Sequence, residues 1–288
     1  MAIALASIKR TIRPCLDPLR GPITWACQRG LLSSRIREYL PWRWPRVDPF
    51  TIYGNGWRCR WFPTEFDDIG VEIFWSGLRH WETETIPVVL ANIQRSRCFI
   101  DIGANCGIYT VFAAITNPTI RCIAIEPVPK VCAALARNVR ENNLNSRVLI
   151  MKVAVGDSNG VVGFHEAQNA TMGSLELLGY QGQSGSLIQV QCRTLDSIVE
   201  ELSVEPDFIK IDVEGFEHAV LAGASRVLHE FRPCIVLEAN PGDPYMTVTE
   251  ILKKYEYRVH LITDDGVEPR AEIFPDSRYR NWLCVPAP

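Results

Sequence analysis

The chain has 288 residues, of which 47 % are hydrophobic and 22 % are charged, with a formal net charge of −3. A chain of this length and apolar content can bury one large core or two modest ones, which excludes a disordered, collagen-like or coiled-coil protein. It contains no run of 18 or more apolar residues, so we expect no membrane-spanning helix.

The ten cysteines are scattered along the chain and form no C-x-x-C pair. Several of them lie inside apolar runs, namely Cys98, Cys122, Cys234 and Cys284. A disulfide framework or a zinc site needs closely and regularly spaced cysteines, so this pattern favours packed, reduced thiols and predicts a cytoplasmic protein.

Residues 1–46 form a basic front end, in which nine lysines and arginines stand against two acids. We predict a basic helical arm here, and three roles fit it: packing on the main domain, organellar targeting, or peripheral contact with an anionic membrane or acidic partner. We favour packing. Membrane contact through residues 1–46 would instead place an otherwise cytoplasmic protein at a lipid surface.

Residues 47–90, called the lead-in segment below, connect this arm to the main domain. Pro49 and Pro63 interrupt regular structure, and "FTIYGNGWRCRWF" (50–62) predicts a β-hairpin. Its turn falls at Asn55-Gly56, a dipeptide that tolerates the positive φ angles of a tight hairpin turn.

From residue 98 onward, strand-like and helix-like runs alternate. We expect seven strands, at residues 98–102, 120–126, 147–153, 208–212, 234–238, 257–262 and 281–285, and helices at 107–116, 129–142, 214–229 and 245–255. This alternation predicts an α/β, Rossmann-like fold whose mostly parallel sheet carries helices on both faces. Ligands of such sheets bind outside the carboxyl ends of the strands, where the sequence places Asp101, Glu126, Ala154, Asp212 and Glu238.

Two further strand-like pieces, "GVVGFHE" (160–166) and "SLIQVQC" (186–192), interrupt this alternation. The intervening loop is rich in Gly, Ser and Gln. We expect residues 40–80 and the loop at 166–186 to choose the substrate, and neither region carries a motif that identifies it.

The turn after the first strand reads Asp101-x-Gly103-x-Asn105-x-Gly107. A dinucleotide would favour G-x-G-x-x-G and a phosphate-binding helix start, whereas an acid at the strand end attracts the ammonium and sulfonium of S-adenosylmethionine. No Lys or Arg lies within 98–120, and Glu126 ends the second strand, where a carboxylate can accept both ribose hydroxyls. We therefore predict S-adenosylmethionine as the cofactor. The simpler alternative, glycines that merely permit a tight turn, leaves both acids without a role.

A second strand-then-acid signal is "DFIKIDVEGFEHAVLAGA" (207–224). Asp212, Glu214 and Glu238 are predicted at or just after strand ends on the ligand side, so they are the candidate catalytic bases. Three converging carboxylates could also bind a hard divalent cation, an interpretation that we rank below simple base catalysis and do not adopt. Acids in a first helical turn also act as caps, which gives Glu214 a structural alternative.

With these segments in view, the chain resembles the FkbM-type methyltransferases, an S-adenosylmethionine-dependent family of the class I methyltransferase fold. The resemblance rests on "FIDIGANCGIYT", "AIEPVP", "VAVGD", "RTLDSI" and "IKIDVEGFEHAVLAGA", in this order, with "WETET" (81–85) before them. It implies a seven-stranded sheet with a reversed last strand, and a class I methyltransferase domain over residues 91–288. It also implies methyl transfer to a hydroxyl of a sugar, glycolipid or small natural product.

The resemblance also assigns cofactor-binding residues to this sequence. It implies that the first turn holds the methionine part, that the second strand's acid holds the ribose, and that Ala154 or its neighbours flank the adenine. With the first glutamate of "WETET", the implied set is Glu82, Asp101, Gly103, Ala104, Asn105, Gly107, Glu126, Pro127 and Ala154.

Three rival functions remain to be weighed. A nucleotide-dependent oxidoreductase is disfavoured by Asp101 and by the missing G-x-G-x-x-G. A nucleic-acid base methyltransferase would need an Asn/Asp-Pro-Pro-aromatic turn after the fourth strand and a basic face; "EANPGDPY" (238–245) follows the fifth strand instead, so we expect no nucleic-acid partner. A catalytically inactive interaction protein that kept the fold stays open as the main alternative.

Overall fold

The computed structural model describes residues 20–28, 31–32, 36, 48–64, 67–166, 174–175 and 186–288. Most of the predicted basic arm and most of the loop at 166–186 therefore lie outside the described residues. The described part of the arm includes one helix, α2 (Arg20–Gln28), which packs on α4 (Asp68–Ser76) through Cys27, Val71 and Trp75.

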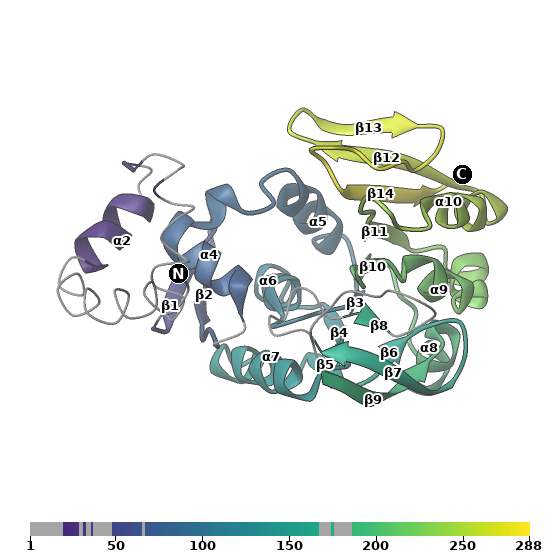
Figure 1. Ribbon diagram of the computed structural model, residues 1–288, viewed down its shortest axis with the longest axis horizontal. Coiled ribbons are helices and arrows are strands. Elements are labelled where there is room, and N and C mark those ends of the chain that lie inside the picture. The colour runs from purple at the N-terminus through teal and green to yellow at the C-terminus, as the bar shows by residue number, and fades with distance from the viewer. Residues whose placement is uncertain are drawn as a thin grey trace, which may run out of the picture.

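An eight-stranded sheet forms the centre of the molecule, in the order β13-β12-β14-β11-β10-β3-β4-β5 (Figure 1). Its strands are β3 (Cys98–Ile102), β4 (Arg121–Ile125), β5 (Val148–Met151), β10 (Phe208–Ile211), β11 (Cys234–Glu238), β12 (Tyr257–Thr263), β13 (Gly266–Arg270) and β14 (Asn281–Pro286). Neighbours from β5 to β11 are parallel, and β14 runs antiparallel to both β11 and β12. The predicted α/β sheet with a reversed last strand is confirmed.

The eighth strand, β13, was not predicted. It pairs antiparallel with β12 through a turn at Asp264 and Asp265, followed by Gly266 with a φ of +116°. Its sequence, GVEPR, has a proline and alternating exposed residues, which suits an edge strand but gives a weak local signal.

Helices cover both faces of the sheet, as predicted (Figure 1). Two hydrophobic cores result, one under each helical layer. The first layer consists of α5 (Thr85–Ile93), α6 (Ile108–Thr116) and α7 (Pro129–Glu141); the second consists of α8 (Leu195–Leu202), α9 (Glu217–Ala222), η4 (Val227–Phe231) and α10 (Tyr245–Lys254).

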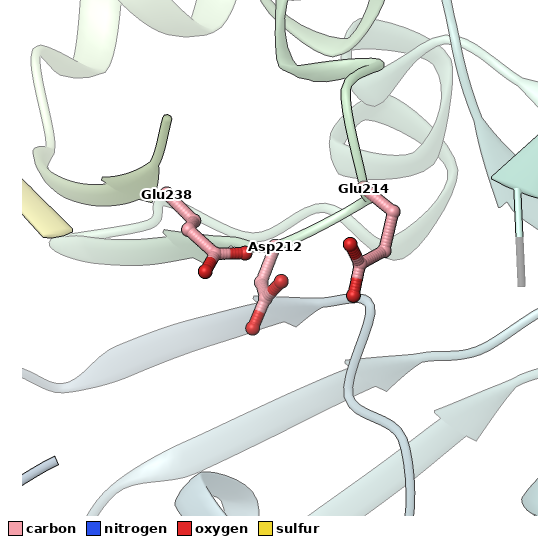
Figure 2. A group of neighbouring side chains, drawn as sticks. All are labelled: Asp212, Glu214 and Glu238. Carbon is pink, nitrogen blue, oxygen red and sulfur yellow. The ribbon is translucent and has the colours of Figure 1, made fainter. Parts of the chain in front are cut away.

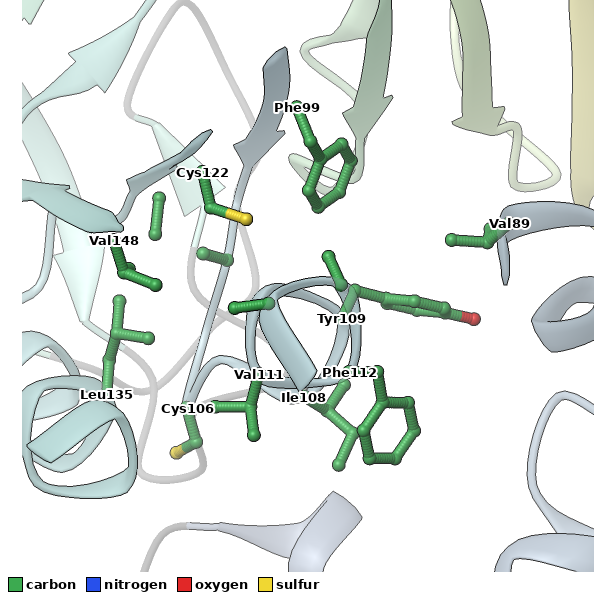
Figure 3. Close-up of a cluster of buried hydrophobic side chains, with 14 of the residues drawn as sticks. Val89, Phe99, Cys106, Ile108, Tyr109, Val111, Phe112, Cys122, Leu135 and Val148 are labelled. Carbon is green, nitrogen blue, oxygen red and sulfur yellow. The ribbon is translucent and has the colours of Figure 1, made fainter. Parts of the chain in front are cut away.

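The first core lies around α6, which is buried almost all round (Figure 3). Phe99 from β3, Cys122 from β4 and Val148 from β5 face it from the sheet, while Val89 and Leu135 close it from α5 and α7. A helix apolar on every side must be covered on every side, and here the sheet, α5 and α7 provide that cover.

The helix predicted at 214–229 is wrong in its extent. Glu214 and Gly215 have φ values of +52° and +95°, so α9 begins only at Glu217 and ends at Ala222. Gly223 packs closely on the backbone of Gly156, and Asp196 accepts hydrogen bonds of 2.9 Å from the amides of Arg226 and Val227. Contacts with distant segments therefore split the helix. The helices α4, α5 and α8 were not predicted.

Smaller elements flank the main sheet. The predicted hairpin is confirmed as β1 (Phe50–Tyr53) paired antiparallel with β2 (Arg58–Trp61). A second sheet, in the order β6-β9-β7-β8, contains β6 (Ala154–Val155), β7 (Gly160–Glu166), β8 (Ser174–Leu175) and β9 (Ser186–Arg193). The two extra strand-like pieces are thus β7 and β9. A short 3₁₀ helix, η2 (Leu78–His80), precedes Trp81.

The cysteines and the lengths of the helices complete the description of the fold. The nine cysteines that the structure describes are all free and eight of them are buried, which confirms packed thiols. Among the described residues, no helix is both long enough and apolar enough to cross a membrane.

Candidate active site

A cleft opens at the carboxyl ends of β3, β4 and β10, enclosing about 920 Å³ of space that is partly open to solvent. Most of the predicted site residues line it: Glu82, Asp101, Gly103, Ala104, Asn105, Glu126, Pro127, Ala154, Asp212 and Glu214. Gly107 and Glu238 do not line this cleft. Topology explains the gathering, because parallel strands bring their carboxyl ends to one edge of the sheet.

The turn after β3 is fixed by its neighbours. Gly103 has a φ of +77°, and a Cβ there would lie 1.8 Å from the carbonyl oxygen of Asp212. The amides of Gly103 and Ala104 both donate to the carbonyl of Ile125, at 3.0 Å. Gly103 thus lets the first turn touch the end of β10, which a side chain would prevent.

Gly107 lies beside α7 and does not line the cleft. Its φ is +89°, and a Cβ there would lie 2.1 Å from Cδ1 of Leu135 on α7. Gly107 therefore allows α6 and α7 to pack closely just before α6 begins. Gly107 therefore contributes to the helix packing that supports the cleft and does not line the cleft itself.

Glu126 links the first turn to the second. Its Oε2 accepts a 3.1 Å hydrogen bond from the amide of Asn105, and its Oε1 accepts one of 2.9 Å from the amide of Val128. The side chain is buried, and desolvation raises its pKa to about 7 despite these two donors. A carboxylate oxygen has more than one lone pair, so both oxygens retain capacity to accept from a ligand in the cleft.

Asp101 lies at the floor of the cleft, and Oδ2 accepts a 2.6 Å hydrogen bond from Oγ1 of Thr110. Burial raises its pKa, while the charge of Lys210 and the Thr110 bond lower it. Thr110 was not singled out from the sequence, although it is the helical neighbour that faces this acid.

Lys210 is the residue that sequence reasoning missed. Its Nζ lies 2.7 Å from Oδ2 of Asp212 and 4.9 Å from the ring centroid of Tyr109. Burial alone would lower its pKa, but the charges of Asp212, Glu82 and Asp101 hold the pKa above its ordinary value. A lysine inside the apolar strand FIKI was the available signal.

Asp212, Glu214 and Glu238 converge (Figure 2), with ligand oxygens that all lie within 4.8 Å of one another. Desolvation and the negative charges of Asp212 and Glu214 raise the pKa of Glu238 to about 9. The neutral Glu238 carboxyl then donates a hydrogen bond to Asp212, whose pKa Lys210 lowers against the effect of burial. Asp212 is therefore ionised and Glu238 protonated at neutral pH.

Glu214 stands at the solvent side of this cluster. Desolvation, followed by the charges of Asp212, Glu217 and Asp243, raises its pKa to about 8. Three carboxylates at this spacing have the oxygen chemistry of a hard-cation site. Here the ammonium of Lys210 and the proton shared by Asp212 and Glu238 already compensate the negative charge of these carboxylates. Base catalysis therefore remains the better interpretation.

Glu82 comes from the lead-in segment, between η2 and α5. The hydroxyl of Tyr109 donates a hydrogen bond to its Oε2, and the ring of Trp81 lies 5.5 Å from that of Tyr109. Desolvation raises the pKa of Glu82 to about 7, against the charge of Lys210. The lead-in segment thus forms one wall of the cleft.

The sheet order, the reversed β14 and the acid-glycine turn together define a methyltransferase of the class I fold. Within that class, the chain belongs to the FkbM methyltransferase family, because the model of the methyltransferase FkbM domain matches residues 101–259.

Named relatives agree with this family. The chain is 30 % identical over 151 residues to the 31-O-demethyl-FK506 methyltransferase FkbM of Streptomyces tacrolimicus, covering 43 % of this chain and 57 % of that protein. It is 25 % identical over 225 residues to the hexuronic acid methyltransferase AglP of Haloferax volcanii, covering 77 % of this chain and 87 % of that protein. The match therefore spans little more than half of the first relative's length.

Among solved structures, the chain is similar to a methyltransferase FkbM from Methylobacillus flagellatus, with 21 % identity and a TM-score of 0.43. That alignment covers 66 % of this chain and 43 % of the other.

Proposed function

We propose that this protein transfers a methyl group from S-adenosylmethionine to a hydroxyl oxygen of a small molecule or glycan. The observation that carries the proposal is the set of acidic side chains that lines the cleft. Five acids line it, namely Glu82, Asp101, Glu126, Asp212 and Glu214, and Lys210 is the one cation among the described lining residues. A cationic, phosphate-free cofactor suits such a cleft, whereas a pyrophosphate would be repelled.

The residues present fit the parts of that cofactor. The turn at Gly103 and Asn105, with Asp101 below it, suits the methionine end, and the free acceptor capacity of Glu126 suits the ribose hydroxyls. The apolar wall suits an adenine ring, since it is built from Val128, Val153, Ala154, Val155 and Phe164. The cofactor would supply an electrophilic methyl group.

The protein's own contribution to transfer would be alignment and proton removal. Orienting two reactants correctly can supply about 7–11 kcal/mol of the barrier. Asp212 is ionised but a weak base, because Lys210 lowers its pKa; we assign it the task of orienting the acceptor hydroxyl. Glu214, with a pKa of about 8, is better matched to accept the proton near neutral pH, since base catalysis is most effective when the pKa lies near the working pH.

The names of the relatives support an oxygen acceptor on a natural product or a sugar acid. The alignments cover 57 % and 87 % of these two proteins, and the acceptor class is therefore part of this proposal.

Binding and transfer can be tested separately. S-adenosylmethionine at a hundred times its Kd should stabilise the full chain by about 2.7 kcal/mol in thermal unfolding. Asp101→Asn should remove this stabilisation, and the matched control Asp157→Asn, an exposed acid, should retain it. Tritiated methyl transfer would then be followed over glycan, lipid-glycan and small-polyketide extracts. Binding without any transfer would favour the inactive interaction protein; absence of binding would refute the proposal.

A further inference from the structure

Lys210 occupies an unusual place for a charged residue. It lies inside β10, in the middle of the sheet, and only 3 % of it is exposed. Its pairing partner on β3 is Asp101, and paired residues of neighbouring strands point to the same face. The ammonium therefore lies under the cleft, on the face covered by α6.

Charged and titratable groups reach this ammonium from every element packed around it. Asp212, just after the end of the same strand, lies 2.7 Å away, and Tyr109 of α6 places its ring 4.9 Å away. Asp101 of β3 and Glu82 of the lead-in segment act on it through their charges. Glu238 of β11 acts through its hydrogen bond to Asp212.

This arrangement brings the carboxylates of Asp212, Asp101 and Glu82 toward one buried cation. Carboxylates that share a poorly solvated space cannot all remain ionised without a compensating charge, and one of them would otherwise take up a proton. Among the described lining residues of the cleft no second cation is available. The protonation of Asp212 therefore depends on Lys210.

We propose that Lys210 is the positioning residue of this cleft. Its ammonium keeps Asp212 ionised and turned toward the cleft, and it holds Glu82 of the lead-in segment and Asp101 of β3 close to it. The inference rests on the proposed function, since an ionised Asp212 affects transfer only when an acceptor hydroxyl lies beside it. A lysine with only a structural role would hold the strands together and leave the pKa of Asp212 unchanged.

The test measures that proton directly. Protein labelled with ¹³C at the aspartate carboxyl carbons would be titrated by NMR, with signals assigned through Asp212→Asn and Asp101→Asn. In the wild-type protein, Asp212 should titrate below the ordinary aspartate value. In Lys210→Met the midpoint should rise by about one unit or more, equivalent to tenfold in the ionisation constant. In Lys210→Arg, which keeps the charge, it should stay low.

Two results would overturn the inference: an Asp212 that titrates at or above its ordinary value in the wild-type protein, or a folded Lys210→Met variant with an unchanged midpoint. If Lys210→Met does not fold, the wild-type and Lys210→Arg titrations still decide. Lys253→Met, which removes an exposed lysine on α10, is the matched control and should leave the Asp212 signal unchanged.

The kinetic consequence separates this inference from the proposed function. Once an acceptor is found, the ratio of kcat in Lys210→Met to kcat in the wild-type protein should fall about five- to tenfold one pH unit below the Asp212 midpoint that NMR gives for the variant. The ratio should recover as pH rises and Asp212 ionises. A pH-independent loss of kcat would contradict the positioning role. Failure of wild-type protein to bind S-adenosylmethionine would refute the proposed function and leave the NMR result standing.

Discussion

Replacing Gly103 by alanine probes the contact that joins the first turn to the end of β10. An alanine Cβ would lie 1.8 Å from the carbonyl oxygen of Asp212, so the two segments would have to separate by more than about 1 Å before the packing is tolerable. A left-handed backbone costs an L residue about 1–2 kcal/mol, and overpacking typically costs about 1–3 kcal/mol. We expect Gly103→Ala to lower the free energy of unfolding by about 2–5 kcal/mol and to weaken S-adenosylmethionine binding, because both halves of the cleft move.

Gly56→Ala is the matched control, because Gly56 has a φ of +79° and open space where a Cβ would be placed. It should show the backbone cost alone, about 1–2 kcal/mol, with unchanged cofactor affinity. Urea unfolding gives the free energies and isothermal titration calorimetry gives the affinities. Equal destabilisation of the two variants, with equal affinity for the cofactor, would mean that the turn does not touch β10 and that our account of the cleft floor is wrong.

Three further outcomes are expected. Methyl transfer should rise with pH to a midpoint near 8, because the raised pKa of Glu214 requires that it lose a proton before acting as a base; a pH–rate profile that is identical in Glu214→Gln would remove it from this role. Burial raises the pKa of Glu126 from 4.5 to about 7, so its proton stabilises the folded state below pH 4.5 and this stabilisation is lost as pH rises to 7. Between these pH values, the free energy of unfolding of the wild-type protein should fall by about 3 kcal/mol relative to that of Glu126→Gln. Parallel curves for the two proteins would contradict the burial of this side chain. Because we favour packing of residues 1–46 on the main domain, full-length protein and protein lacking residues 1–46 should behave alike on anionic vesicles at low salt; flotation of the full-length protein alone, lost at high salt, would assign the arm to membrane contact instead.

Much of the cleft could be predicted from short stretches of sequence. Asp101, Glu126 and Asp212 each end an apolar strand, and the topology of a parallel sheet brings strand ends together without any knowledge of side-chain packing. The turn at Gly103 was recognisable because a glycine that closely follows a strand-end acid is typical of a turn that approaches a ligand. Elements whose signal is local, such as the hairpin at Asn55-Gly56 and the start of α7 at Pro129, were predicted for the same reason.

The sequence by itself determined the fold class and the acidic edge of the sheet, because periodicity and strand-end residues are local properties. The tertiary structure decided how the charges of that edge are balanced. Lys210 lies more than a hundred residues after Asp101 in the chain, and a search for cations near the first turn could not find it. The splitting of the helix at Gly223, the packing role of Gly107 and the pairing of Glu82 with Tyr109 were likewise fixed by contacts between distant segments. Protonation depends on the sum of such contacts, so it could be known only once the chain was folded.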